Sequence, residues 1–179
     1  MDTTRHRQRV RPATLRLLDG LRAPAHLLGR RLDVLACNRL AAALIADFPA
    51  LPRAERNQAR FVFTDPHARD LFADWPAAAG TTTALLHRDA RRHPDDPALG
   101  ELIGDLSIRS AEFAVRWAAP RQRTSAVAGY HHPLVGDLTL ATQIWQADGD
   151  PDQLLVVQTA EPGSPSEAAL ALLDQLARG

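Results

Sequence analysis

Lysine is absent from this sequence, and cysteine occurs only once. All 21 basic residues are arginines, and 21 acidic residues balance them to a formal net charge of zero. Because the chain is also rich in alanine, we attribute the arginine-only usage to GC-rich coding rather than to selection for phosphate contacts. The single cysteine, Cys37, excludes an internal disulfide and a zinc site built from several cysteines.

Long apolar runs are also missing. No stretch approaches the roughly 20 residues that a membrane-spanning helix needs, and the N-terminus has no apolar signal-peptide core. The sequence therefore predicts a cytoplasmic protein without membrane contact. Its 179 residues suit one domain, which at this size can bury a sufficient core without a disulfide or a metal.

Catalytic and metal-binding signatures are absent too. There is no glycine-rich phosphate loop and no Gly-x-Ser-x-Gly turn, because the glycines are scattered along the chain. His131 and His132 are adjacent, so on a strand their side chains point to opposite faces and cannot share a metal ion. His87 and His93 lie on a polar helix, at a spacing that does not place them on one face, and are expected to be solvated. We therefore expect no metal site.

The remaining reactive side chains have plainer explanations. Cys37 could act as a redox sensor, but free cysteine is among the most buried residue types, which favours a core thiol. Asp95 and Asp96 precede a proline at a helix start, where capping is favoured over acid–base chemistry. An enzyme such as an isomerase or a hydrolase would need a perturbed base facing a cavity, and His132 and Asp137 are the candidates. No partner that would orient such a base is visible, so we expect neither catalysis nor a cofactor.

Helical signals dominate the chain up to Pro120. Apolar residues recur there at helical spacing, and prolines and capping residues mark the ends. The Ser164–Glu167 segment is a capping box that opens a C-terminal helix. The predicted helices cover 13–22, 39–46, 54–63, 66–73, 77–92, a segment that opens at Asp96-Pro97, one that Ser110 caps, and one that follows Ser164.

Strand signals fall into two groups. Short apolar stretches at 25–28 and 32–37, separated by Gly29-Arg30-Arg31, predict a hairpin. After Pro120 the pattern has period two, which predicts strands at 124–131, 137–145 and 154–159. Because strands do not alternate with helices, we predict an α+β fold. It consists of a five-stranded antiparallel sheet (two N-terminal and three C-terminal strands), a central helical block over one face, and flanking N- and C-terminal helices.

Aromatic residues make up only 5% of the chain, yet most of them fall in the predicted helical block. Helices that cover a sheet direct such side chains toward it. There they form either solid core or the lining of an apolar cavity, the usual setting of a small-molecule pocket. The candidate ligand-binding residues are Phe63, Phe72, Trp75, Phe113 and Trp117.

Segments spread from about residue 12 to residue 176 carry a family resemblance. They are PATLRLLDGL, RRLDVLACN, ERNQARFVFTDPHARDLFADW, RHPDDP, LSIRSAEFAVRWA, HHPLVGDLTL and DPDQLLVVQTAEPGSPS. Through them the chain resembles the ligand-binding domain of MmyB-like transcription regulators, which are common in actinobacteria. One departure is Cys37, where the family often has tryptophan.

The resemblance implies a PAS-like fold in which an antiparallel sheet carries helices, in agreement with the α+β prediction. It also implies a sensor of small hydrophobic molecules in transcription regulation, with fatty-acyl compounds the leading suggestion. We expect a homodimer that relays occupancy of the pocket. The alternative is a PAS-like dimerisation or interaction module that has no small-molecule ligand.

The family's recurring polar positions correspond here to Arg56, Asn57, Arg60, Asp65, Arg109, Glu112 and His132. Arg56 and Arg60 lie one helical turn apart and could hold one anion, such as a fatty-acid head group. Arg60 is therefore a further candidate ligand-binding residue. A structural ion pair with Asp65, Asp70 or Glu112 is the plainer alternative.

Family members usually carry an XRE-type helix-turn-helix ahead of this domain, and too few residues precede the first matching segment here to form one. We therefore expect a basic linker or disordered tail over residues 1–11 and the PAS-like ligand-binding domain over residues 12–179. DNA contact is expected only through a helix-turn-helix outside this chain, because an arginine-rich tail by itself binds weakly and without sequence preference.

Overall fold

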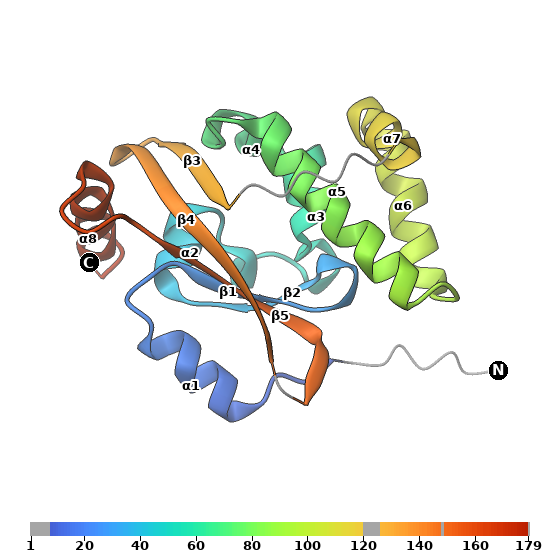
Figure 1. The fold of residues 1–179 in the computed structure, drawn as a ribbon, viewed down its shortest axis with the longest axis horizontal. Coiled ribbons are helices and arrows are strands. Elements are labelled where there is room, and N and C mark those ends of the chain that lie inside the picture. The colour runs from blue at the N-terminus through green and yellow to red at the C-terminus, as the bar shows by residue number, and fades with distance from the viewer. Residues whose placement is uncertain (1–7, 120–125, 148, 179) are drawn as a thin grey trace.

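The computed structural model describes residues 8–119, 126–147 and 149–178. At its centre is a five-stranded antiparallel sheet in the order β2-β1-β5-β4-β3 (Figure 1). The N-terminal hairpin joins the C-terminal meander through the ladder between β1 and β5. The strands are β1 (Ala25–Leu28), β2 (Val34–Cys37), β3 (Val127–His132), β4 (Gly136–Ala147) and β5 (Asp150–Thr159). The predicted α+β arrangement is confirmed.

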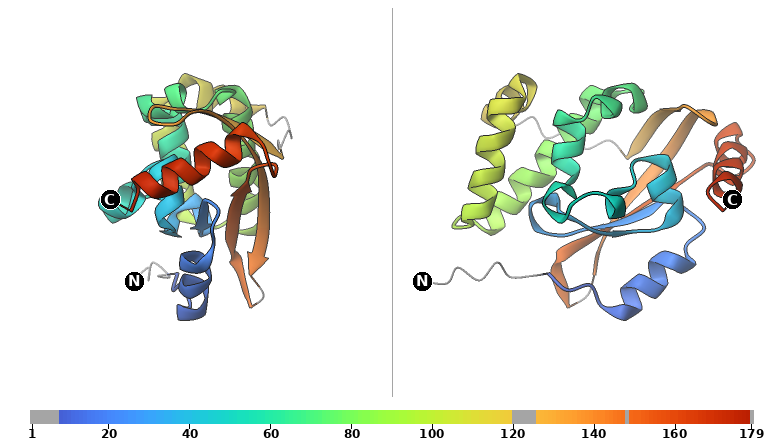
Figure 2. Two further views of the ribbon diagram at one scale, coloured as in Figure 1. Left: turned by 90° about the vertical axis from the view of Figure 1, so that its left-hand side faces the viewer. Right: turned by 180° about the vertical axis from the view of Figure 1, so that it is seen from behind.

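The helices α3 to α7 lie together on one side of the sheet, and α1 lies apart from them (Figure 1). Helix α8 and the α6–α7 pair lie at opposite ends of the molecule (Figure 2). None of the described helices is both long and apolar enough to cross a membrane. The helices are α1 (Pro12–Gly20), α2 (Arg39–Leu44), α3 (Gln58–Thr64), α4 (Pro66–Leu71), α5 (Trp75–Arg92), α6 (Pro97–Arg109), α7 (Ala111–Ala118) and α8 (Pro165–Leu176), with 3-10 turns η1 (Arg30–Leu32), η2 (Phe48–Ala50) and η3 (Arg53–Glu55).

Side-chain alternation along the strands produces two separate apolar clusters. On one face, Leu28, Leu140 and Val156 pack with the helical layer in the main core. On the other face, Leu27 packs against Leu18 of α1 in a smaller cluster. Because successive strand residues point to opposite faces, the helix-facing positions supply both the core and the lining of any space between sheet and helices.

The predicted helix over 54–63 is shorter than expected. Its first residues form the 3-10 turn η3, and α3 begins only at Gln58. The cause is Asn57, whose side-chain oxygen accepts hydrogen bonds from the backbone N–H groups of Ala59 (2.9 Å) and Arg60 (3.1 Å). Asparagine in this role starts a helix rather than continuing one.

All three predicted C-terminal strands are present. β4 and β5 extend beyond the predicted 137–145 and 154–159, because the two strands keep pairing toward the turn between them. The first residues of the predicted strand over 124–131 lie outside the described residues, and β3 within them is confirmed.

Residues 8–11 lie against the domain. The Gln153 side chain donates a hydrogen bond to the backbone oxygen of Arg9 (3.1 Å), and the Arg11 guanidinium lies 2.8 Å from the carboxylate of Asp150. This part of the expected linker is therefore in contact with β5. The rest of that linker lies outside the described residues.

The turn between β1 and β2 is strained and is held by the helical layer. Arg31 and Leu32 have positive φ angles of 59° and 61°, which residues other than glycine rarely adopt. The carboxylate of Asp96, which caps α6, accepts hydrogen bonds from Arg30 (2.6 Å) and Arg31 (3.0 Å). In α5, Asp89 accepts from the backbone N–H of Arg31 (3.0 Å). Burial disfavours charge on Asp96, but Arg31 and Arg30 keep its pKa below the usual value.

Asn38 joins three segments at the end of β2. Its side-chain oxygen accepts from the backbone N–H of Ala41 (2.9 Å) at the start of α2 and from that of Ala25 (3.1 Å) in β1. Its amide nitrogen donates to the backbone oxygen of Ala23 (2.7 Å), in the segment after α1. Because the residue is only 5% exposed, solvent cannot readily replace these partners.

We expect Asn38→Ala to lower the free energy of unfolding by about 2–3 kcal/mol, because it removes a helix cap and leaves buried backbone groups unpaired. Asp65→Ala is the matched control. Asp65 caps α4 through one exposed hydrogen bond from the backbone N–H of His67 (2.9 Å), so its loss should cost about 1 kcal/mol or less. Urea denaturation measures both variants, and equal losses would contradict the joining role of Asn38.

Candidate functional site

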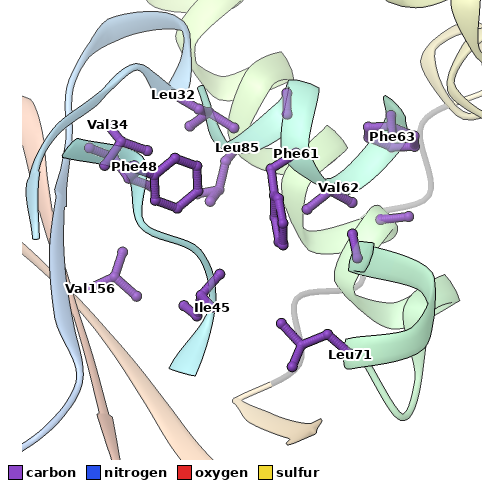
Figure 3. Close-up of a cluster of buried hydrophobic side chains, with 14 of the residues drawn as sticks. Leu32, Val34, Ile45, Phe48, Phe61, Val62, Phe63, Leu71, Leu85 and Val156 are labelled. Atoms are coloured by element: carbon purple, nitrogen blue, oxygen red, sulfur yellow. The ribbon is translucent and has the colours of Figure 1, made fainter. Parts of the chain in front are cut away.

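A pocket lies between the helix-facing side of the sheet and helices α3 and α5. The space between atoms there amounts to about 900 Å³, a volume that includes open solvent. Figure 3 shows Phe48, Phe61, Leu85 and Val156, from the strand and helix layers, directed toward this region. The pocket is lined by His26, Ile45, Phe48, Gln58, Phe61, Val62, Phe72, Asp74, Ala77, Ala78, Thr81, Thr82, Leu85, Val127, Ala128, Gly129, Tyr130, Thr142, Ile144, Val156 and Gln158.

Aromatic side chains form a connected wall of the pocket. Phe48 meets Phe61 edge to face with 5.7 Å between ring centroids, and Phe61 meets Phe72 in the same way at 6.3 Å. Phe72 continues the row to Tyr130 of β3 at 5.4 Å. A backbone bridge between Phe72 and Tyr130 fixes the segment after α4 against the sheet edge. The wall thus spans from η2 across the helices to β3.

The sheet side of the pocket carries buried polar groups. His26 Nε2 lies 3.2 Å from the side-chain oxygen of Gln58, while its Nδ1 atom meets no hydrogen-bond partner among the described residues. The amide nitrogen of Gln158 donates to the hydroxyl of Tyr130 and, at 3.4 Å, to that of Thr142. The side-chain oxygen of Gln158 is buried, and no group in the described part of the chain hydrogen-bonds to it. Two polar atoms of the lining residues are therefore unsatisfied.

The interior of the pocket is uncharged at neutral pH. Burial lowers the pKa of His26 to about 4, against a smaller opposing effect of the Gln58 hydrogen bond. Burial raises the pKa of Tyr130 to about 12. Asp74 is the one residue of the described lining with a formal charge; it is exposed and caps α5 by accepting from the backbone N–H of Ala77 (2.9 Å).

The aromatic residues predicted from the sequence separate into two groups. Phe72 lines the pocket, but the other four do not. Those four pack together on the far side of the helical layer: Phe63 meets Phe113 at 5.0 Å and Trp75 at 5.8 Å, and Phe113 stacks with Trp117 at 5.9 Å. Figure 3 shows Phe63 on the opposite side of α3 from the sheet.

Arg60 does not line the pocket either, and its guanidinium forms an ion pair with Asp105 of α6. Arg56 donates instead to the backbone oxygens of Leu51 (2.8 Å) and Pro49 (2.7 Å). The two arginines therefore do not converge on one anion. The structural ion pair that the sequence offered as the alternative is present, although its partner is not among the three acids expected.

The other recurring polar positions have structural partners. Glu112 pairs with Arg69 (2.7 Å) and Arg109 lies 3.7 Å from Asp105. Asn57 and Asp65 are the helix caps described above. None of these side chains lines the pocket.

The histidine pair on β3 behaves as predicted. His131 is exposed, with Nδ1 2.6 Å from the carboxylate of Asp137, whereas His132 is buried, with Nε2 3.0 Å from the backbone oxygen of Ala43. Neither His132 nor Asp137 lines the pocket. In the described parts of the chain, no group of three His, Cys, Asp or Glu side chains is placed to hold a metal ion.

The predictions for the remaining reactive side chains had mixed outcomes. Cys37 is half-buried, and burial raises its pKa to about 11, so the thiol stays protonated. Asp96 caps α6 as expected, accepting from the backbone N–H of Ala98 (3.1 Å). The prediction of a solvated His87 is wrong, because its ring stacks on Trp117 with centroids 3.8 Å apart.

Sequence reasoning missed the polar residues of the pocket, above all His26, Gln58 and Gln158. One signal was available. His26 and Gln158 each occupy a strand position whose neighbours two residues along, Leu28 and Val156, are core residues. A polar side chain at a core-facing position needs a partner or a ligand.

His26 should make the fold sensitive to acid. The unfolded imidazole takes up a proton near pH 6.5, whereas the folded one does so only near pH 4. Between these values the unfolded state binds more protons, so stability is full above pH 6.5 and falls as the pH approaches 4. Across that window, we expect His26 to lower the free energy of unfolding by up to about 1.4 kcal/mol for each unit by which the pH falls. The measurement is the difference in unfolding free energy between the unaltered protein and His26→Phe as a function of pH. A constant difference would refute the burial of a neutral imidazole.

Comparison with known families agrees with this geometry. The family model described as the MmyB-like transcription regulator ligand binding domain matches residues 10–173. No curated protein matches the chain. The matched segment includes every element from α1 to β5 and the entire pocket lining, and the family is a class of regulator domains rather than of enzymes. The chain belongs to the MmyB-like transcription regulator ligand-binding domain family.

Proposed function

We propose that this domain senses a small hydrophobic molecule, such as a fatty-acyl compound, bound in the pocket between the sheet and helices α3 and α5. The observation that carries the proposal is the pocket itself, which has a connected aromatic wall, in a family of regulator ligand-binding domains. Burying an acyl chain there contributes about 0.8 kcal/mol for each methylene removed from water.

Phe72 is the contact residue that we retain from the sequence prediction. It belongs to the aromatic wall and bridges to β3. Phe63, Trp75, Phe113 and Trp117 then support the helical layer from behind. In this arrangement Arg60 stabilises the contact between α3 and α6 through Asp105.

Regulation requires that the ligand favour one arrangement of the domain, because equal affinity for two states shifts neither. The pocket is suited to this task since its walls come from separate layers. Residues of β1, β3, β4 and β5 form one side, and residues of α3 and α5 form the other. A ligand that contacts both would alter how the helices sit on the sheet, and a DNA-binding domain or partner would read that change.

We expect Ala78→Phe to weaken the binding of medium- and long-chain acyl probes by about tenfold or more. The phenyl group would occupy part of the pocket, and the ligand contacts that it replaces are worth roughly 1.4 kcal/mol of binding free energy. Ala78 lies on the pocket-facing side of α5 and is half-buried. Ala171→Phe, on the exposed face of α8, is the control and should bind normally. Calorimetry with the probes, and mass spectrometry of lipids extracted from purified protein, measure the outcome. The proposal fails if no lipid copurifies and no probe binds the unaltered protein.

A homodimer is the second candidate function, favoured by apolar surface on the opposite face of the sheet. Trp145 of β4 is 60% exposed and lies opposite Leu155 in the ladder. Leu155 borders the small cluster beneath α1, and Leu17 of α1 is 51% exposed. We propose that this face pairs with a second copy of the chain, either to relay ligand occupancy or as the domain's sole role.

We expect Trp145→Glu to convert such a dimer to monomer, because a carboxylate would be buried against apolar surface without a partner. Ile108→Glu is the control, since Ile108 is 88% exposed on α6, which lies on the other side of the sheet from this face. Sedimentation velocity over a range of protein concentrations measures the state. If both variants and the unaltered protein sediment alike, this face is not the dimer surface.

A further inference from the structure

We infer that the pocket selects a neutral amphiphile whose polar end donates hydrogen bonds, such as a primary amide or an alcohol, over one that ends in a carboxylate. The inference rests on the proposed function and concerns the same pocket. It assigns His26 and Gln158 as the residues that receive the polar end of the ligand.

The two residues occupy neighbouring positions on one face of the sheet. His26 of β1 pairs with Val156 of β5, and Gln158 is the next residue of β5 on that face. Such diagonal neighbours stand about 7–8 Å apart, within reach of one ligand head group. His26 is 6% exposed and Gln158 is 3% exposed, and both line the pocket.

Their hydrogen-bond partners leave two acceptors free. Because Gln58 presents its carbonyl oxygen to His26 Nε2, that nitrogen carries the proton and Nδ1 has a lone pair. The Gln158 amide nitrogen donates to the hydroxyls of Tyr130 and Thr142. The side-chain oxygen of Gln158 therefore remains available as an acceptor. Both free atoms lack a partner among the described residues. Buried acceptors of this kind are costly unless a donor meets them, and a primary amide offers two N–H groups.

The electrostatics of the pocket oppose a carboxylate. The described lining contains no arginine, and its one charged residue, Asp74, is itself an anion. His26 does not supply a positive charge at neutral pH, because burial lowers its pKa to about 4. Arg56 and Arg60 each lie two residues from Gln58 in the sequence, but Arg56 donates to backbone oxygens and Arg60 is paired with Asp105. A carboxylate would therefore lose its hydration without gaining a cation, and it would face the free acceptor atoms of His26 and Gln158.

The test compares four probes with one alkyl chain: dodecanamide, dodecan-1-ol, methyl dodecanoate and dodecanoic acid. Calorimetry with the full chain at neutral pH should show the amide and the alcohol binding about tenfold or more tightly than the acid and the ester. An acid that binds as tightly as the amide would overturn the inference and leave the proposed function standing. If no probe binds, the proposed function fails, and the inference fails with it.

A variant separates the role of His26 from general binding. His26→Phe keeps an aromatic ring at this position but removes both ring nitrogens, so the preference for amide over ester should fall severalfold. His131→Phe is the matched control on the exposed side of β3 and should keep the full preference. An unchanged preference in His26→Phe would overturn the assignment of that residue.

A second measurement uses the unaltered protein, so its outcome does not depend on whether a variant folds. Nitrogen NMR of the imidazole groups in the unaltered protein reports whether Nδ1 of His26 accepts a hydrogen bond. The Nδ1 resonance should shift upfield when dodecanamide binds. A resonance that stays in place while calorimetry shows binding would overturn the inference.

Discussion

The structure depends on one constraint, the alternation of side chains along five paired strands. It sends Leu28, Leu140 and Val156 into the main core and Leu27 toward α1. The same alternation turns His26 and Gln158 toward the helical layer, where both side chains are buried. Core and pocket are therefore two parts of a single surface. A register slip of one residue in β5 would turn Val156 of the core and Gln158 of the pocket to the opposite face.

The helical layer is held over that surface by polar contacts at its margins. Asp96 and Asp89 hold the strained turn between β1 and β2, and the Phe72 bridge fixes the segment after α4 to β3. The four aromatics behind α3 fill the space between helices rather than the space beneath them. The pocket is the region between these attachments, where small residues such as Ala77 and Ala78 of α5 face the sheet. This layout suits a sensor, because a ligand there contacts both layers at once.

The fold was largely predictable because its local signals are strong and agree with one another. Asn38, Ser110 and Ser164 each cap a helix as their sequence context indicates. The period-two pattern after Pro120 correctly predicted the three strands of the C-terminal meander. The main error lay at Asn57, which interrupts a run of helical propensity with a cap. The turn at Arg31 was also hidden, since its positive φ is maintained by acids far along the chain. The candidate site was predicted less well, with only Phe72 of six proposed residues in the pocket.

By itself, the sequence determined the order of helices and strands, the α+β class and the family, because caps, prolines and hydrophobic periodicity act over a few neighbouring residues. The tertiary structure alone decided which aromatics became core and which became pocket wall. Phe61 and Phe63 lie on one short helix, yet α3 directs the first toward Phe48 and Phe72 and the second toward Phe113. It also brought His26 and Gln158, which are far apart in the chain, to one place. Their pairing arises from the ladder between β1 and β5, a long-range contact that no local pattern encodes.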